Sequence, residues 1–178
     1  MSRIFKRKSI MKAILAILFC VALSSCAGYH LGGVKPPSLS EVKTISVPMF
    51  VNGSQHPRAE SLATSALTDA IVQDGTYRLA DRSKADAVLE GKLTSIDYST
   101  LRSSRLDSLL AEELTNTIRI EWVLRDARDP TKVLASGTND GTSSFFVDSN
   151  LQTARQNALP DALKRASQGV VTKLASGY

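Results

Sequence analysis

The chain has few of the side chains that hold metals or act as nucleophiles and bases. It contains only two cysteines, Cys20 and Cys26, and two histidines, His30 and His56. A metal site needs several thiolate or imidazole ligands at suitable spacing, which these residues do not supply. His56 stands beside Pro57, and no serine lies in the strand–turn–helix motif of a serine hydrolase. The sequence therefore predicts no catalytic residue, no metal site and no cofactor, so the protein is not expected to be an enzyme.

A net positive charge is also missing once the first residues are set aside. The formal charge is +5, and basic residues near the start carry all of it. These are Arg3, Lys6, Arg7, Lys8 and Lys12. Residues 13–178 contain 17 basic and 17 acidic side chains. A surface that binds nucleic acid needs an excess of Lys and Arg to pair with phosphates, so we expect no nucleic-acid partner.

No apolar run is long enough to cross a membrane as a helix. The longest, Ala13–Leu23, has 11 residues, whereas a spanning helix needs ~20. It follows the basic start and precedes Leu23-Ser24-Ser25-Cys26, an order typical of a secretory signal peptide. A Leu three residues before a Cys, with small residues between them, is similar to a lipobox. We therefore predict that residues 1–25 are removed and that Cys26 becomes the lipidated first residue.

The isolation of Cys26 favours this prediction. Cys20 leaves with the signal peptide, so Cys26 has no disulfide partner and would be open to oxidation as a free thiol. The alternative is an ordinary signal peptide cut near Ala22 or Ser25. Acyl chains such as palmitate would anchor the chain, because each buried methylene contributes about 0.8 kcal/mol. Ala27 stands where Asp usually marks retention at the inner membrane, so we expect the outer membrane.

Composition divides the mature chain into a tether and one domain. Residues 26–40 are rich in Gly, Pro and small polar side chains, which predicts a flexible tether that is unpacked at least in its first half. Residues 41–178 have the length of a single domain. We expect this domain to begin with a strand over Thr44–Phe50 that Pro48 interrupts or ends. A helix from Pro57 to Asp74 should follow, closed by a glycine.

Alternating apolar residues predict the remaining strands. We expect a brief strand at 77–79, then strands over 87–98, 115–126 and 133–147. A switch of parity in the first of the longer strands indicates a bulge near Thr94-Ser95. Residues 100–114 are expected to form an excursion with one or two helical turns. Asp140-Gly141 would also suit a hairpin turn, but one long, bent strand is the preferred interpretation.

The strand over 115–126 has the clearest division into two faces. Its core face is expected to carry Ile118, Ile120, Trp122 and Leu124. Its opposite face, toward water or a partner, is expected to carry Arg119, Glu121 and Arg125. One of Phe145 and Phe146 must also face outward. A helix over 150–176 closes the chain, and Pro160 should kink it or mark a restart.

This order of elements predicts an α+β fold. We expect a two-layer sandwich with a mostly antiparallel sheet of four to five strands and two helices on one face. Several segments along this fold also resemble a known family. They are Cys26-Ala27-Gly28-Tyr29-His30-Leu31, the segment 85–91, Ser144-Phe145-Phe146, and Lys164-Arg165-Ala166-Ser167 in the last helix. In this order, behind a lipobox, they resemble LptE, the lipopolysaccharide-assembly lipoproteins. Members usually have Gly directly after the Cys, so Ala27 is an extra residue.

The resemblance implies a function that composition cannot show. It implies an outer-membrane lipoprotein on the periplasmic side that plugs the lumen of the LptD β-barrel in a 1:1 complex. Such a protein supports assembly of the barrel and assists delivery of lipopolysaccharide to the outer leaflet. The alternative is a lipid-anchored periplasmic scaffold of another envelope secretion or polysaccharide-export complex.

The resemblance also implies site residues. Family members have basic residues that contact lipopolysaccharide near the middle connection between strands and near the start of the last helix. Arg102, Arg105 and Arg155 fall in these regions, so they are the lipopolysaccharide-contact candidates. The outward row of Arg119, Glu121 and Arg125 contains the candidates for contact with the barrel.

Overall fold

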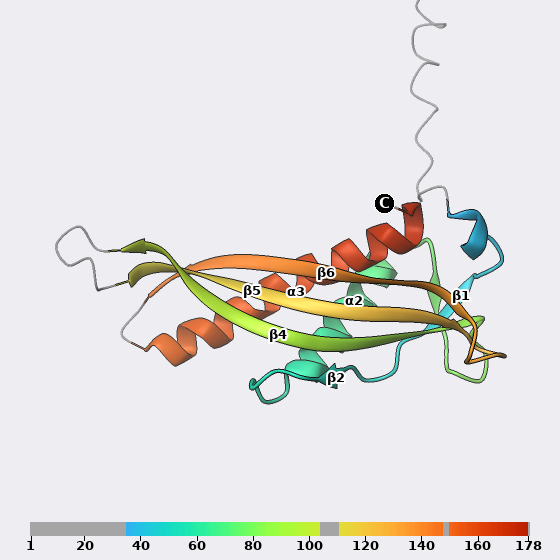
Figure 1. Cartoon of the computed structure of the whole chain (residues 1–178), viewed down its shortest axis with the longest axis horizontal. Helices are drawn as coiled ribbons and strands as arrows, with labels where there is room; N and C mark the ends of the chain where they lie inside the picture. Colours follow the sequence, from blue (N-terminus) through green and yellow to red (C-terminus); the bar gives the residue numbers. More distant parts are fainter. Residues whose placement is uncertain (1–34, 104–110, 148–149, 178) are drawn as a thin grey trace, which may run out of the picture. The chain divides into compact units, whose positions relative to one another are not determined.

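A computed structural model describes residues 35–103, 111–147 and 150–177, all within one unit, Gly32–Tyr178. Two helices cover one face of a six-stranded sheet (Figure 1). The strands are β1 (Thr44–Ser46), β2 (Val51–Asn52), β3 (Arg78–Leu79), β4 (Ala87–Ser103), β5 (Ala111–Asp126) and β6 (Val133–Phe146). The helices are α2 (Ala59–Asp74) and α3 (Leu151–Ser176). The predicted α+β class is therefore confirmed.

The sheet has the strand order β3-β1-β4-β5-β6, with β2 also paired to β4. Strands β4, β5 and β6 form a long antiparallel meander, whereas β1, β2 and β3 pair in parallel. The predicted strand over Thr44–Phe50 divides into β1 and β2 on either side of Pro48, and both parts lie along β4. A proline cannot donate to a ladder, which accounts for the interruption and for one strand more than expected.

The described parts of residues 100–114 correct the sequence prediction. β4 continues to Ser103 and β5 begins at Ala111, so the expected excursion with helical turns is wrong there. Arg102 pairs with Glu113 across the two strands. Cross-strand pairing overrides the helical spacing of the leucines, because strand preference depends on neighbours more than on the local segment. The predicted bulge is confirmed by a register shift between Leu93 and Ser95.

The last strand and last helix each settle an open alternative. β6 is one strand through Asp140 and Gly141, so the hairpin alternative is wrong. α3 passes through Pro160 without a break, so a restart there is also wrong. Asn150 caps this helix through its Oδ1, which accepts from the Thr153 N–H at 3.2 Å.

The start of α2 differs from the prediction. The helix begins at Ala59 rather than at Pro57, because Arg58 has a left-handed backbone with φ of 64° at the N-cap. Gly75, with φ of 74°, closes the helix as predicted. Before β1, Pro37–Leu39 form a 3-10 turn and Leu39 is buried in the core. The packed body therefore reaches into the second half of the segment 26–40.

The core lies between the helices and the sheet. Ile118, Ile120, Trp122 and Leu124 are all buried, which confirms the predicted parity of β5. Leu163 and Val170 of α3 meet this face, and Leu67 and Ile71 of α2 are buried beside them. No described helix is both long and apolar enough to span a membrane.

The Asp86 carboxylate, just before β4, forms hydrogen bonds to residues at the start of β1. Asp86 Oδ2 accepts from the Lys43 N–H at 3.0 Å, the Thr44 N–H at 2.9 Å and Thr44 Oγ1 at 2.9 Å. The two backbone N–H groups favour the charged form most strongly and lower the pKa of Asp86. A carboxylate with a lowered pKa stabilises the fold above its unfolded-state pKa, and this contribution is lost as pH falls through the folded-state pKa.

The substitution Asp86→Asn is expected to destabilise the protein at neutral pH by about 1–2 kcal/mol, since hydrogen bonds to a charged group are lost in a partly solvated place. The difference from the wild type should be full above about pH 4 and should shrink at lower pH as Asp86 itself becomes protonated. Urea unfolding of both proteins between neutral and acidic pH measures it. A difference that does not change with pH would contradict the role of the charge.

Candidate functional site

The sheet face opposite the helices carries a row of charged pairs. Arg119 binds Asp140 with two hydrogen bonds of 2.8 Å, from Nε to Oδ1 and from a terminal nitrogen to Oδ2. This pairing lowers the pKa of Asp140 and raises that of Arg119. Arg125 Nε lies 3.1 Å from Glu90 Oε2, and Glu121 is exposed between the two pairs. The predicted row of Arg119, Glu121 and Arg125 is therefore on one face.

These pairs are exposed, so they add little stability. The side chains of Arg119 and Asp140 keep 53% and 43% of their surface accessible. Exposed ion pairs typically contribute about 0–1 kcal/mol. No described helix covers this face of β4, β5 and β6 (Figure 1), and charged side chains lie along it at Arg119, Glu121 and Arg125. It is thus available for contact with another molecule.

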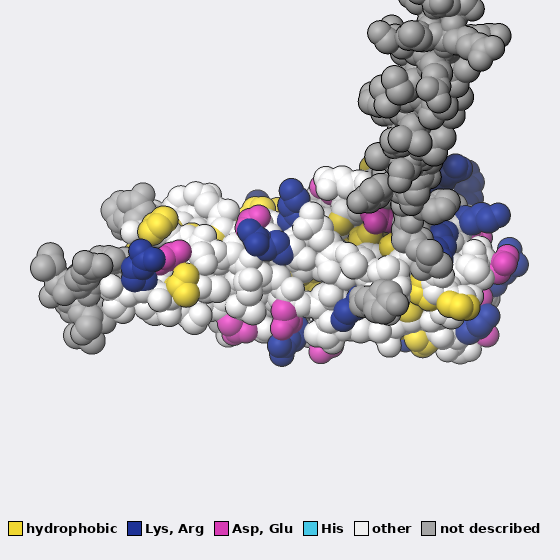
Figure 2. Space-filling view, turned by 90° about the horizontal axis from the view of Figure 1, so that it is seen from above, with side chains coloured by type: hydrophobic (Ala, Val, Ile, Leu, Met, Phe, Trp, Pro, Cys, Tyr) yellow, Lys and Arg dark blue, Asp and Glu magenta, His cyan; other side chains and the backbone are white. Residues whose placement is uncertain are grey.

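On the same face, at the end where β4 and β6 finish and β5 begins, the positively charged side chain of Arg102 lies near apolar side chains. Arg102, Glu113 and Phe146 are paired across β4, β5 and β6. Arg102 is 66% exposed and stands 3.8 Å from Glu113, while Phe146 is 70% exposed and Leu101 is 58% exposed. The expectation that one of Phe145 and Phe146 faces outward is confirmed. Figure 2 shows apolar and charged side chains side by side at this narrow end.

On the helix side of the sheet, Arg155 is held by an aromatic ring. Its guanidinium carbon lies 4.6 Å from the centre of the Tyr98 ring, the geometry of a cation–π contact. The Tyr98 hydroxyl is 3.3 Å from His56 Nε2, and Phe145 meets the same ring edge-on at 6.1 Å. Burial raises the pKa of Tyr98. No ion pair of Arg155 occurs among the described residues.

Beside Tyr98 lies a polar residue in the interior. Asn116 is paired with Tyr98 across the strands and is fully buried. Neither of its amide atoms has a hydrogen-bond partner among the described residues, and the same holds for Arg155 Nε. At this end of the sheet, the interior between the sheet and α3 therefore contains the polar side chains of Asn116, Tyr98 and Arg155 in place of an apolar core. Sequence analysis missed this cluster, although the parity of β4 places Tyr98 on one face with Ile96.

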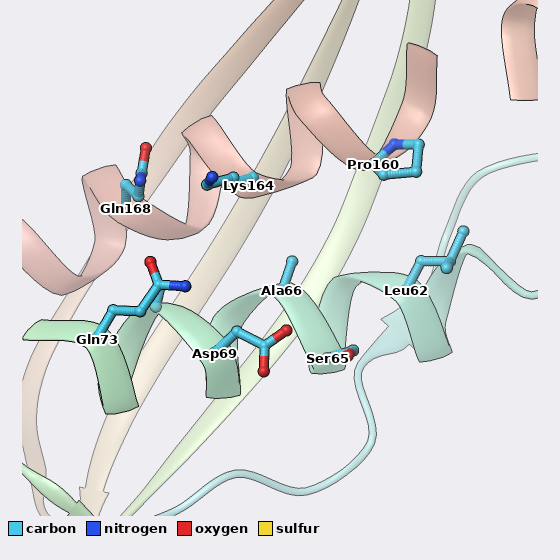
Figure 3. A pocket seen from close by; sticks show the side chains of 9 residues that line it. Leu62, Ser65, Ala66, Asp69, Gln73, Pro160, Lys164 and Gln168 are labelled. Atoms are coloured by element: carbon cyan, nitrogen blue, oxygen red, sulfur yellow. The ribbon is translucent and has the colours of Figure 1, made fainter. Parts of the chain in front are cut away.

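A groove also runs between the two helices. Ala66, Asp69 and Gln73 of α2 face Pro160, Lys164 and Gln168 of α3 across it (Figure 3). It encloses about 320 Å³. Small side chains such as Ala66 leave this space, which the sequence did not predict. Nothing among the described residues singles out a ligand for it.

The structure brings together only some of the predicted site residues. Arg102 is on the open face, whereas Arg155 lies under the sheet on the helix side, so these two do not form one site. Cys26 and Arg105 fall outside the described residues. The roles assigned to all of them remain predictions.

Solved structures of other proteins share the fold. Protein XCC0632 from Xanthomonas campestris has 15% identity and a TM-score of 0.52, and the match covers 80% of this chain and 90% of that one. Protein CT253 from Chlamydia trachomatis has 6% identity, a TM-score of 0.52 and coverage of 74% and 95%. A neuraminyllactose-binding hemagglutinin homologue from Helicobacter pylori has 11% identity, a TM-score of 0.52 and coverage of 84% and 90%. At these identities the likeness shows the fold alone.

The family comparison reaches further. A search of curated proteins gives no match. The model of one family, LptE, described as lipopolysaccharide-assembly, matches residues 42–174. This range begins just before β1 and ends within the last turn of α3, so it spans the whole sheet and both helices. The chain therefore belongs to the LptE family of lipopolysaccharide-assembly proteins.

Proposed function

We propose that this protein is an outer-membrane lipoprotein that plugs an LptD-like β-barrel, supports its assembly and assists delivery of lipopolysaccharide to the outer leaflet. It acts in a 1:1 complex, with acyl chains on Cys26 as its membrane anchor and its body on the periplasmic side and in the barrel lumen. The family match over residues 42–174 carries this proposal. A non-enzymatic role accords with the family.

The open face of the sheet supports the plug. The interior of a wide outer-membrane barrel is polar, so a plug needs a broad polar surface. The face with Arg119, Glu121 and Arg125 offers both signs of charge without a covering helix. Two helices behind it keep the sheet rigid through the apolar core. We assign this face to the barrel wall.

The narrow end of the sheet suits an amphipathic ligand. Lipopolysaccharide combines phosphates with acyl chains, and the exposed Arg102 stands near the apolar side chains of Leu101 and Phe146. Arginine can bind a phosphate with two parallel hydrogen bonds. Arg155 offers a second guanidinium, on the other side of the sheet and without a described acidic partner. We assign Arg102, Arg105 and Arg155 to contact with lipopolysaccharide.

The double substitution Arg102→Glu and Arg105→Glu is expected to weaken lipopolysaccharide binding about tenfold or more, since each lost charged hydrogen bond is typically worth ~1.5–3 kcal/mol. Arg155→Glu should weaken it separately. Binding of the purified protein to lipopolysaccharide is the measurement. Arg128→Glu, in the exposed turn between β5 and β6, reverses one charge as Arg155→Glu does and is the control for it. Combined with Arg82→Glu, also at an exposed turn residue, it reverses two charges and is the control for the double variant. Unchanged binding by the double variant would remove these residues from the proposal.

A further inference from the structure

The last strand leaves a long backbone edge without a strand partner. β6 lies at the end of the strand order and pairs only with β5. Twelve of its 14 residues, from Ala135 to Phe146, pair with β5 in constant register, and the one register shift lies at the start of the strand, between Val133 and Ala135. Apart from β5, no described backbone group bonds to this strand. Such a row of N–H and C=O groups can pair with another extended chain.

One contact shows which residues turn these groups outward. Lys173 of α3 donates a hydrogen bond of 2.9 Å from its Nζ to the Thr138 carbonyl oxygen. This carbonyl therefore points away from β5. In an antiparallel ladder the N–H and C=O of one residue point to the same side, and the side alternates along the strand. Thr142 and Ser144 therefore also direct their backbone groups outward. Lys173 covers Thr138. Beyond Asp140, Thr142 and Ser144 are exposed, whereas α3 packs against Gly141 and Ser143.

The edge has few of the features by which proteins prevent strand addition. Natural edge strands are usually short, or carry lysines, prolines or bulges. β6 has no proline and no lysine, and its one ionisable residue, Asp140, is paired with Arg119. The side chains of Thr142 and Ser144, which lie on this edge, are exposed and uncharged. This edge is built like a docking strand.

We infer that the outer edge of β6 from Asp140 to Phe146 binds an extended segment of the barrel partner by β-sheet addition. The inference rests on the proposed function for the identity of the partner. The occupant follows from the chemistry of the edge, because only another extended backbone matches its alternating donors and acceptors. The edge is also continuous with the face assigned to the barrel, since the Asp140 side chain binds Arg119 there. A second copy of this chain is the competing occupant.

Amide hydrogen exchange tests the inference on the full lipidated protein, alone and bound to its barrel partner. In the protein alone, the outward amides of Thr142 and Ser144 should exchange rapidly, whereas the inward amide of Ser143 should be slow. In the complex, the two outward amides should slow at least about tenfold. Rapid exchange in the complex would overturn the inference. Slow exchange in the protein alone that depends on its concentration would point to self-pairing and would also overturn it.

A substitution gives a second readout. Thr142→Pro removes an outward N–H that β5 does not use, so the free protein should stay folded. The amount of barrel protein captured from outer membranes with the tagged variant, here called recovery, should fall about tenfold. Thr142→Ala keeps the N–H and should leave recovery unchanged. Equal recovery with both variants, at equal thermal stability, would overturn the inference and leave the proposed function standing. If the wild type recovers no barrel, both fail. Should the proline variant not fold, the exchange measurement decides.

Discussion

Gly141→Ala is expected to destabilise the protein by about 3 kcal/mol or more, a large part of the ~5–15 kcal/mol that holds a typical domain together. Gly141 lies in β6 directly beneath α3. An added Cβ would fall onto the Ala162 carbonyl oxygen and lie 2.5 Å from the Ala166 nitrogen. Both atoms belong to the helix backbone, so no side-chain rotation relieves the overlap and α3 must move off the sheet. Urea unfolding measures the loss.

Gly169→Ala is the matched control. A Cβ there would also come close to another group, 2.6 Å from the Asn139 amide nitrogen, but this is the end of a flexible side chain. Alanine is also favoured over glycine inside a helix by about 1 kcal/mol, which offsets part of the cost. We therefore expect a much smaller change than at Gly141. Equal destabilisation by the two substitutions would show that the close approach of β6 and α3 does not limit stability.

Cys26→Ala is expected to abolish acylation completely, because the proposed anchor joins the acyl chains to the Cys26 thiol and residues 27–178 contain no other cysteine. Labelled palmitate should enter the wild-type protein and be absent from the variant. Cys20→Ala is the control, since the proposed cleavage removes residue 20 with the signal peptide and labelling should be unchanged. The wild-type N-terminal mass should fit an acylated Cys26. A mature form that begins elsewhere, or a labelled Cys26→Ala variant, would contradict the proposed anchor.

Local sequence patterns predicted the parts of the fold that follow from burial. Alternation in residues 115–126 gave the correct core face, since Ile118 and Ile120 are fully buried and Arg119 is exposed. Gly75 marked the end of α2, because the left-handed turn there suits glycine. The bulge in β4 followed from the change of parity. These features depend on near neighbours along the chain.

Features that depend on distant neighbours were not predictable. The extension of β4 to Ser103 comes from pairing with β5, which overrides the polar, leucine-spaced pattern. The parallel pairing of β1 and β2 with β4 depends on α2 crossing back over the sheet. α3 runs through Pro160 because neighbouring Leu159 and Ala162 are buried against the sheet.

For the candidate site, the sequence predicted which face the residues lie on but not which residues they contact. Parity placed Arg119, Glu121 and Arg125 on one face, and the structure agrees. Partners could not be inferred, so the pairing of Arg119 with Asp140 and the stacking of Arg155 on Tyr98 came only from the structure. The position of Arg155 on the side of the sheet opposite Arg102 likewise depends on how α3 crosses under β4 and β6.

Recovery of bound partners from outer membranes tests the central claim most directly. The tagged full chain is extracted in mild detergent, captured, and the proteins that remain bound are identified by mass. The proposed function predicts one outer-membrane β-barrel protein in equal amount with the acylated chain, together with lipopolysaccharide. An unacylated chain in the periplasm with no outer-membrane partner, or capture of a soluble export assembly in place of a barrel, would contradict it.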